Sequence, residues 1–170
     1  MEKLSVLVQK LVTGGVEFVL VGGYAAVAHG ASVMTRDVDI CCPFSPENLS
    51  RLACVLADLH PKHRMTPQKL PLEITDELAS RLKNLYLETD LGVLDCLSEV
   101  LGLGTFEHVL RESIENTIPS GKCRLLGLDA LIRAKEAMGR PLDRITAVQL
   151  RAIKERLTTS TPANTALPDI

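Results

Sequence analysis

Aromatic side chains are scarce in this chain of 170 residues. They make up 3% of the sequence and tryptophan is absent, whereas hydrophobic residues of all kinds reach 46%. We therefore expect a core built from Leu, Val, Ile and Ala, and the length suits one domain with a sizeable core. The shortage of rings disfavours modules that stack nucleic-acid bases on exposed aromatic side chains.

An excess of charge of one sign is lacking as well. The formal net charge is −2, and no basic block marks a nucleic-acid surface. A local basic patch is still compatible with the sequence, so a nucleic-acid partner stays open.

Zinc-finger spacing and a membrane-spanning run are also missing. The five cysteines are odd in number and form no C-x-x-C pair, which is typical of reduced, buried thiols.

The longest apolar run, residues 16–28, is interrupted by glycines and is too short to span a bilayer. The start, MEKLSVLVQKL, has helical periodicity and does not resemble a signal peptide. We expect a soluble, cytoplasmic protein without a membrane partner.

Hydrophobic periodicity predicts alternating helices and strands in the first half of the chain. The predicted elements are a helix over 2–13, a buried strand over 17–21, a short helix over 24–29, a strand over 37–42 and a helix from Pro46 to about residue 60 with Ser45 as N-cap. Residues 60–80 contain three prolines and predict a long loop with a short helix over 74–80.

The second half predicts antiparallel strands followed by helices. Its predicted elements are a hairpin over 83–100 that turns at 90–92, a short helix over 105–111, a hairpin over 114–126, and helices over 128–139 and 141–157. The composition of residues 158–170 predicts a disordered tail. The fold class is therefore α/β (α+β): one domain over 1–157, with a mixed sheet flanked by helices and with C-terminal helices.

Two aspartates interrupt the second predicted strand. Side chains at i and i+2 of a strand share a face, so Asp37 and Asp39 point the same way. Two unpaired carboxylates would repel each other, and a divalent cation removes that repulsion; Mg²⁺ favours such ligands. The alternative is a pair that faces water at a sheet edge, or an Asx turn at the strand start.

Asp95 is a third acid within an apolar, strand-like run. If its strand lies beside 37–42, three carboxylates converge and can hold one or two metal ions. Alternatively, Asp95 is an ordinary hairpin acid after a turn. Gly22 and Gly23 lie between a strand and a helix, where glycines permit close approach of a phosphate to free N–H groups, although many such pairs are simply turns.

The segment VLVGGYAAVAHGASVMTRDVDI resembles the signature of the nucleotidyltransferase superfamily related to polymerase beta. Its pattern is most similar to the minimal nucleotidyltransferases and the AbiEii-type toxin group. The resemblance implies Mg²⁺ or Mn²⁺ on Asp37, Asp39 and Asp95, and NTP phosphates at Gly22 and Gly23.

Further positions enter through the same resemblance. LDALIRAKEAMGRPLD is similar to a helical Lys followed by Arg and Asp in the group, which puts forward Lys135, Arg140 and Asp143. Lys135 would bind the triphosphate, or else be a solvated or snorkelling lysine. Arg140 and Asp143 could simply pair with each other. Thr35 is implied near the phosphates.

One position departs from the pattern. Relatives often carry an arginine where this chain has Val33. Arg36 is the candidate replacement for nucleotide binding, although strand alternation would point it away from Asp37.

These observations predict a metal-dependent nucleotidyltransferase that moves NMP from an NTP to a hydroxyl acceptor: a protein, an RNA end or a small molecule. It would be the toxin or transferase part of a toxin–antitoxin system, with a small antitoxin-like partner. The alternative is a catalytically weak nucleotide-binding or regulatory protein of the same fold. A structural domain without a site would instead keep the three carboxylates apart.

Overall fold

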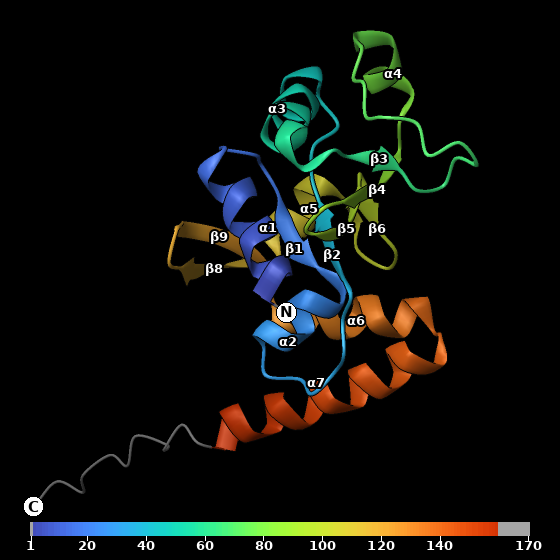
Figure 1. Ribbon diagram of the computed structural model, residues 1–170. Coiled ribbons are helices and arrows are strands. Elements are labelled where there is room, and N and C mark those ends of the chain that lie inside the picture. Colours follow the sequence, from blue (N-terminus) through green and yellow to red (C-terminus); the bar gives the residue numbers. More distant parts are fainter. Residues whose placement is uncertain (1, 160–170) are drawn as a thin grey trace, which may run out of the picture.

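A mixed sheet of seven strands runs through the molecule, flanked by helices (Figure 1). The computed structural model describes residues 2–159. The strands lie in the order β3-β4-β5-β2-β1-β9-β8, and β6 and β7 form a separate ribbon. Their bounds are β1 Val19–Val21, β2 Asp37–Cys41, β3 Lys62–His63, β4 Asn84–Thr89, β5 Gly92–Leu97, β6 Glu99–Val100, β7 Gly104–Thr105, β8 Ser113–Ile118 and β9 Gly121–Leu126.

The helices form two groups around this sheet. α1 contacts β2, β5, β9 and α3, whereas α2, α6 and α7 lie together in the lower part of Figure 1. Their bounds are α1 Glu2–Thr13, α2 Gly22–Ala28, α3 Pro46–Leu56, α4 Asp76–Arg81, α5 Phe106–Arg111, α6 Leu128–Met138 and α7 Pro141–Thr159, with a 3₁₀ turn at Ala57–Leu59. Within residues 2–159, no helix has the length and apolar character needed to cross a bilayer.

The mixed α/β architecture expected from the sequence is confirmed, with differences at particular boundaries. α2 begins at Gly22 itself, because Val21 is its N-cap. The segment expected as a loop contributes β3, which pairs with the edge of β4. α7 extends to Thr159, and residues 160–170 of the expected disordered tail lie outside the described part of the chain.

The centre of the sheet separates an apolar face from a carboxylate face. β2 and β5 run parallel, and alternation buries Val38, Ile40, Leu94 and Cys96 completely. The intervening positions, including Asp39, therefore point to the other face. Burial of each large aliphatic side chain contributes about 2 kcal/mol, so register slips in these strands are strongly disfavoured.

Asn48 ties the two chain segments that lead into and out of the central strands. Its Oδ1 accepts from Glu17 N at 2.9 Å, and its Nδ2 donates to the carbonyl oxygens of Glu17 and Pro43, both at 3.1 Å. Asn48 itself is 3% exposed, so its amide group has little access to water. The start of α3 is thereby joined to the chain before β1 and after β2.

Replacing this amide tests the anchor. Asn48→Ala removes three hydrogen bonds of a buried amide to the backbone of Glu17 and Pro43, and we expect the free energy of unfolding to fall by about 2–3 kcal/mol. Urea denaturation followed by circular dichroism measures the change. Ser50→Ala, at an exposed position of the same helix, is the matched control. Equal urea midpoints for the two variants would contradict the anchoring role.

Candidate active site

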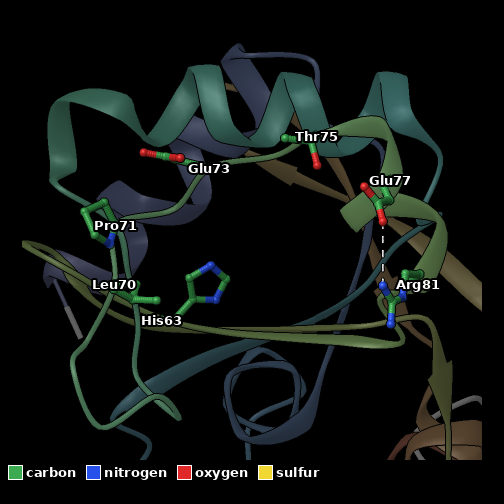
Figure 2. A pocket seen from close by; sticks show the side chains of 7 residues that line it. All are labelled: His63, Leu70, Pro71, Glu73, Thr75, Glu77 and Arg81. Atoms are coloured by element: carbon green, nitrogen blue, oxygen red, sulfur yellow. Dashed lines mark ion pairs between the residues drawn. The ribbon is translucent and has the colours of Figure 1, made fainter.

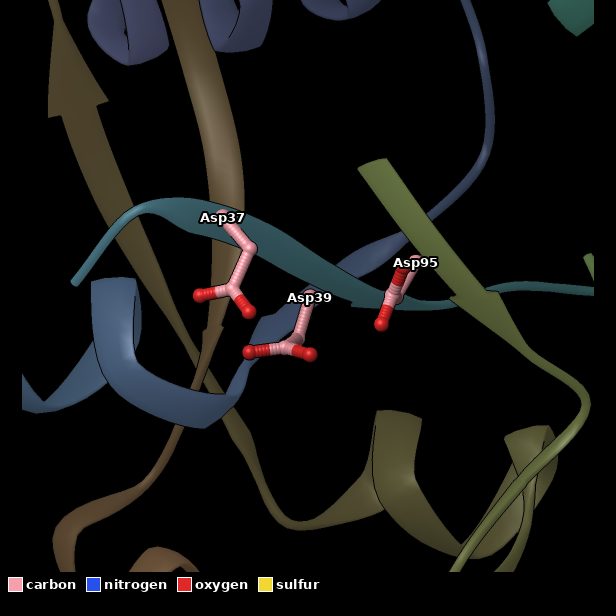
Figure 3. A group of neighbouring side chains, drawn as sticks. All are labelled: Asp37, Asp39 and Asp95. Carbon is pink, nitrogen blue, oxygen red and sulfur yellow. The ribbon is translucent and has the colours of Figure 1, made fainter. Parts of the chain in front are cut away.

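Three carboxylates converge on one face of the sheet (Figure 3). Asp37 and Asp39 share a face of β2, and the parallel register of β2 and β5 sets Asp95 beside Asp39. One oxygen from each of the three lies within 4.8 Å of the others. The expected adjacency of the two strands is confirmed, and a structural domain with dispersed carboxylates is excluded.

The electrostatic environment of Asp39 favours a cation. Its pKa is raised to about 6, first by burial and then by the charges of Asp37 and Asp95. The N–H of Gly23, 3.4 Å from Asp39 Oδ2, and the charge of Lys135 act in the opposite direction but do not compensate. Three clustered carboxylates are a fitting donor set for a hard divalent ion such as Mg²⁺ or Mn²⁺.

The two glycines before α2 make room for the carboxylates. Gly22 has φ +65°, and a Cβ there would lie 1.9 Å from Asp39 Oδ2. A Cβ on Gly23 would lie 2.7 Å from the hydroxyl of Thr35. Both positions therefore require glycine for close packing, and phosphate binding by these residues stays a prediction.

Thr35 lies against the first carboxylate. Its Oγ1 is 2.8 Å from Asp37 Oδ1 and 3.1 Å from the backbone oxygen of Asp37. The hydroxyl donates in this arrangement and so fixes the orientation of the Asp37 side chain. A direct contact between Thr35 and a phosphate stays a prediction.

The α6–α7 junction presents two cations held by one buried acid. Lys135 Nζ lies 2.9 Å from Asp143 Oδ1, and Arg140 Nε lies 2.6 Å from Oδ2. Burial raises the pKa of Asp143, but the hydrogen bonds and charges of Arg140 and Lys135 outweigh it and lower the pKa. The Lys135 side chain is only 12% exposed, which disagrees with a solvated lysine and agrees with either a snorkelling or a phosphate-binding one. The expected pairing of Arg140 with Asp143 is confirmed.

Arg64 is a site residue that the sequence did not reveal. It directly follows β3, at the start of the next turn. Its Nη2 contacts both oxygens of Asp95, at 2.6 and 2.9 Å, and its Nε lies 3.2 Å from Oδ1. Its guanidinium is 5.3 Å from the centre of the Tyr86 ring. No periodicity marks this segment, so only the sheet pairing of β3 brings Arg64 to the site.

A cavity of about 680 Å³ joins these groups. It is lined by the three carboxylates and Arg64, by the chain that follows α2, and by the α6–α7 junction. All predicted site residues line it except Gly22, which lines a smaller, mainly apolar pocket of about 100 Å³ beside Asp39. Arg36 lines the same cavity as Asp37; strand alternation does not separate them because β2 begins at Asp37.

A second cavity lies at the edge of the sheet, beside β3 and α4 (Figure 2). Its volume is about 520 Å³, and its lining includes His63, Glu73 and Glu77, with Arg81 3.7 Å from Glu77. It shares no lining residue with the carboxylate cavity. His63 and Arg64 are adjacent in sequence but line different cavities.

Comparison with solved structures defines the class of fold. The antibiotic-resistance factor ANT(2'')-Ia superposes with a TM-score of 0.55 at 14% identity, over 93% of this chain and 92% of that chain. An antigenic nucleotidyltransferase-like protein from Paracoccidioides brasiliensis gives 0.46 at 15% identity, over 93% and 86%. Neither a family model nor a curated protein matches the sequence. The chain has the fold of nucleotidyltransferases, with an aspartate trio on its sheet.

The raised pKa of Asp39 makes stability depend on pH. The folded pKa of about 6 exceeds the ordinary value of 3.8, so ionisation disfavours the folded state; this cost is absent well below pH 4 and complete above pH 6. We expect Asp39→Asn to raise the free energy of unfolding of the metal-free protein by at most about 3 kcal/mol at pH 8, and by about 1 kcal/mol at pH 4.5.

Urea denaturation in the presence of a chelator measures this difference at both pH values. Glu155→Gln, at an exposed position on α7, is the control. Its stability difference from the unmodified protein should not grow between pH 4.5 and pH 8. A stability difference for Asp39→Asn that stays constant between pH 4.5 and pH 8 would refute the assignment.

Proposed function

We propose that this chain is a metal-dependent nucleotidyltransferase that transfers a nucleoside monophosphate from an NTP to a hydroxyl acceptor. The observation that carries the proposal is the convergence of Asp37, Asp39 and Asp95 within 4.8 Å, in a cavity that also presents Lys135 and Arg140. Anionic ligands for a metal and cationic partners for phosphates thus line one space. Phosphoryl-transfer sites require this combination, because catalysis there is mainly positioning and charge stabilisation.

Each group has a defined part in the reaction. Asp37 and Asp39 would hold Mg²⁺ or Mn²⁺, which neutralises charge on the phosphates when bound. Asp95 accepts the proton of the acceptor hydroxyl while the hydroxyl oxygen forms its bond to the α-phosphorus. The bond from the α-phosphorus to the bridging oxygen breaks, and pyrophosphate leaves.

The remaining residues of the cavity bind the nucleotide. Lys135 pairs with the triphosphate as a point charge, and Arg36 offers a further cation on the same cavity wall. Gly22 and Gly23 permit close approach of the phosphates to the backbone. Thr35 holds Asp37 in the orientation that its ligand role needs.

The acceptor is a protein hydroxyl, an RNA end or a small molecule, and the formal charge of −2 favours the first and last of these. The fold shared with ANT(2'')-Ia, an antibiotic-resistance factor, supports a small-molecule acceptor, because antibiotics are small molecules. The resemblance of residues 19–40 to the AbiEii-type group supports a toxin–antitoxin role with a small antitoxin-like partner. Five free thiols support a reducing, cytoplasmic setting.

A second candidate function is nucleotide binding with weak transfer or none. The contact of Arg64 with both oxygens of Asp95 favours it, because the positive charge of Arg64 makes this carboxylate a weaker proton acceptor. Val33, at the position where relatives often carry arginine, supports the same candidate.

Transfer of label separates the two functions. We expect label from an α-³²P NTP, supplied with Mg²⁺ and fractionated lysate, to enter a protein, RNA or small-molecule fraction. EDTA and Asp39→Asn should abolish this transfer, whereas Asp90→Asn, in the exposed β4–β5 turn, should leave it unchanged. Full Mg²⁺-dependent transfer by Asp39→Asn would sink the proposal. NTP-induced thermal stabilisation without labelled product would favour the binding protein.

Lys135 provides a separate test of phosphate binding. Its side chain is nearly buried beside Asp143, so its charge acts at short range with little screening. We expect Lys135→Ala to raise KM for the NTP by roughly 10- to 100-fold, as expected for loss of a charged hydrogen bond. Steady-state kinetics measures this, with Lys154→Ala on α7 as control. An unchanged KM would exclude Lys135 from the triphosphate site.

A further inference from the structure

Arg64 belongs to a row of side chains that crosses the sheet. Its backbone N donates to the Tyr86 carbonyl oxygen at 3.0 Å, Tyr86 is paired with Asp95, and Asp95 is paired with Asp39. Neighbouring strands lie about 4.8 Å apart, so the Arg64 side chain must span about two strand spacings to reach Asp95. It does so over the Tyr86 ring, 5.3 Å from the ring centre, where the cation is attracted by the ring face.

The guanidinium of Arg64 contacts Asp95, whereas Asp37 and Asp39 accept hydrogen bonds from uncharged donors. Both oxygens of Asp95 accept from Arg64, at 2.6 and 2.9 Å, in a pair whose side chains are 12% and 32% exposed. Asp37 receives the hydroxyl of Thr35, and Asp39 a long contact from the Gly23 N–H. Among the contacts of the described residues, Asp95, the proposed proton acceptor, is thus the one carboxylate of the three that is paired with a cation.

The charges of the cluster match a single divalent ion. Three ionised carboxylates and one guanidinium leave two negative charges, which one divalent ion neutralises. In two-metal sites the ions lie about 3.5–4 Å apart and share carboxylate ligands. A second ion here would compete with Arg64 for the oxygens of Asp95.

We propose that Arg64 takes the place of a second cation, so that the trio binds one divalent ion, through Asp37 and Asp39, while Asp95 stays paired with Arg64. The proposal rests on the metal-dependent function proposed above. Each carboxylate oxygen carries two lone pairs, so Asp95 can hold Arg64 and still accept an acceptor hydroxyl. Arg64 is then a positioning residue, which orients Asp95 and keeps it free of metal.

Metal stoichiometry tests this assignment directly. Titration of the full chain with Mn²⁺, with free ion counted by electron paramagnetic resonance, should give one tight site per chain in the unmodified protein. Arg64→Met keeps an unbranched apolar side chain over Tyr86 but removes the charge, and a second Mn²⁺ site should appear. Arg64→Lys restores a cation and should return the chain to one site. Arg36→Ala, which removes an exposed cation from the same cavity, should keep one site.

The outcomes separate this proposal from the function on which it rests. Two results would overturn the role of Arg64 but not the metal-dependent function. One is two Mn²⁺ sites in the unmodified protein. The other is a single site of unchanged affinity in Arg64→Met when that variant has a native circular dichroism spectrum. Absence of any Mn²⁺ site in the unmodified protein would overturn the metal-dependent function and this proposal together. The double variant Asp37→Asn, Asp39→Asn should lose the first site, and retention of that site would place the ion elsewhere. If Arg64→Met does not fold, Arg64→Gln replaces it in the same titration.

Discussion

Asp37, Asp39 and Asp95 bring three negative charges within 4.8 Å of one another, and the polar groups around them offset that repulsion to different degrees. Arg64 contacts both oxygens of Asp95 and works against the raised pKa that burial gives this acid, whereas Asp39 has a long N–H contact from Gly23 and a pKa raised to about 6. The sheet imposes this arrangement, because the register that buries the apolar face also sets the carboxylates side by side. The fold therefore holds the charges together, and the divalent cation proposed for this site would relieve the cost.

The cations of the α6–α7 junction are kept apart from the trio by Asp143. Without this buried acid, Lys135 and Arg140 would lose the anion that holds them, and the charge of Asp39, which lines the same cavity, would attract both. Asp143 binds both instead, at 2.9 and 2.6 Å. One cavity thus contains a carboxylate, Asp143, whose pKa is lowered by cations, and another, Asp39, whose pKa is raised by burial and by two neighbouring carboxylates. This separation leaves the trio open for a metal while the cations remain within the same space.

Local patterns were sufficient for the parts of the site that lie on single elements. The i, i+2 spacing placed Asp37 and Asp39 on one face, and the apolar run around Asp95 identified its strand. The mixed sheet and most helices followed from periodicity in the same way. These features depend on neighbours along the chain, which a sequence displays directly.

Features that depend on pairing between distant segments were not accessible. Arg64 reaches the site because β3, a strand of two residues with no hydrophobic run, pairs with the edge of β4. The parallel pairing of β1 with β9 joins residues more than a hundred positions apart and has no local signature. The burial of Lys135 depends on how α6 packs against α7, and its helical pattern alone left a solvated, a snorkelling and a phosphate-binding side chain open.

The position of β3 has a consequence for how such a protein changes over generations. The segment that carries Arg64 sits at the margin of the sheet and pairs with one neighbour, outside the tightly packed centre. Substitutions or insertions there leave the buried strands and their carboxylates intact. Under the role proposed for Arg64, the number of ions that the cluster accepts would then be separable from the stability of the fold. Natural variation in one short peripheral segment would change the chemistry of the site while the central strands stay as they are.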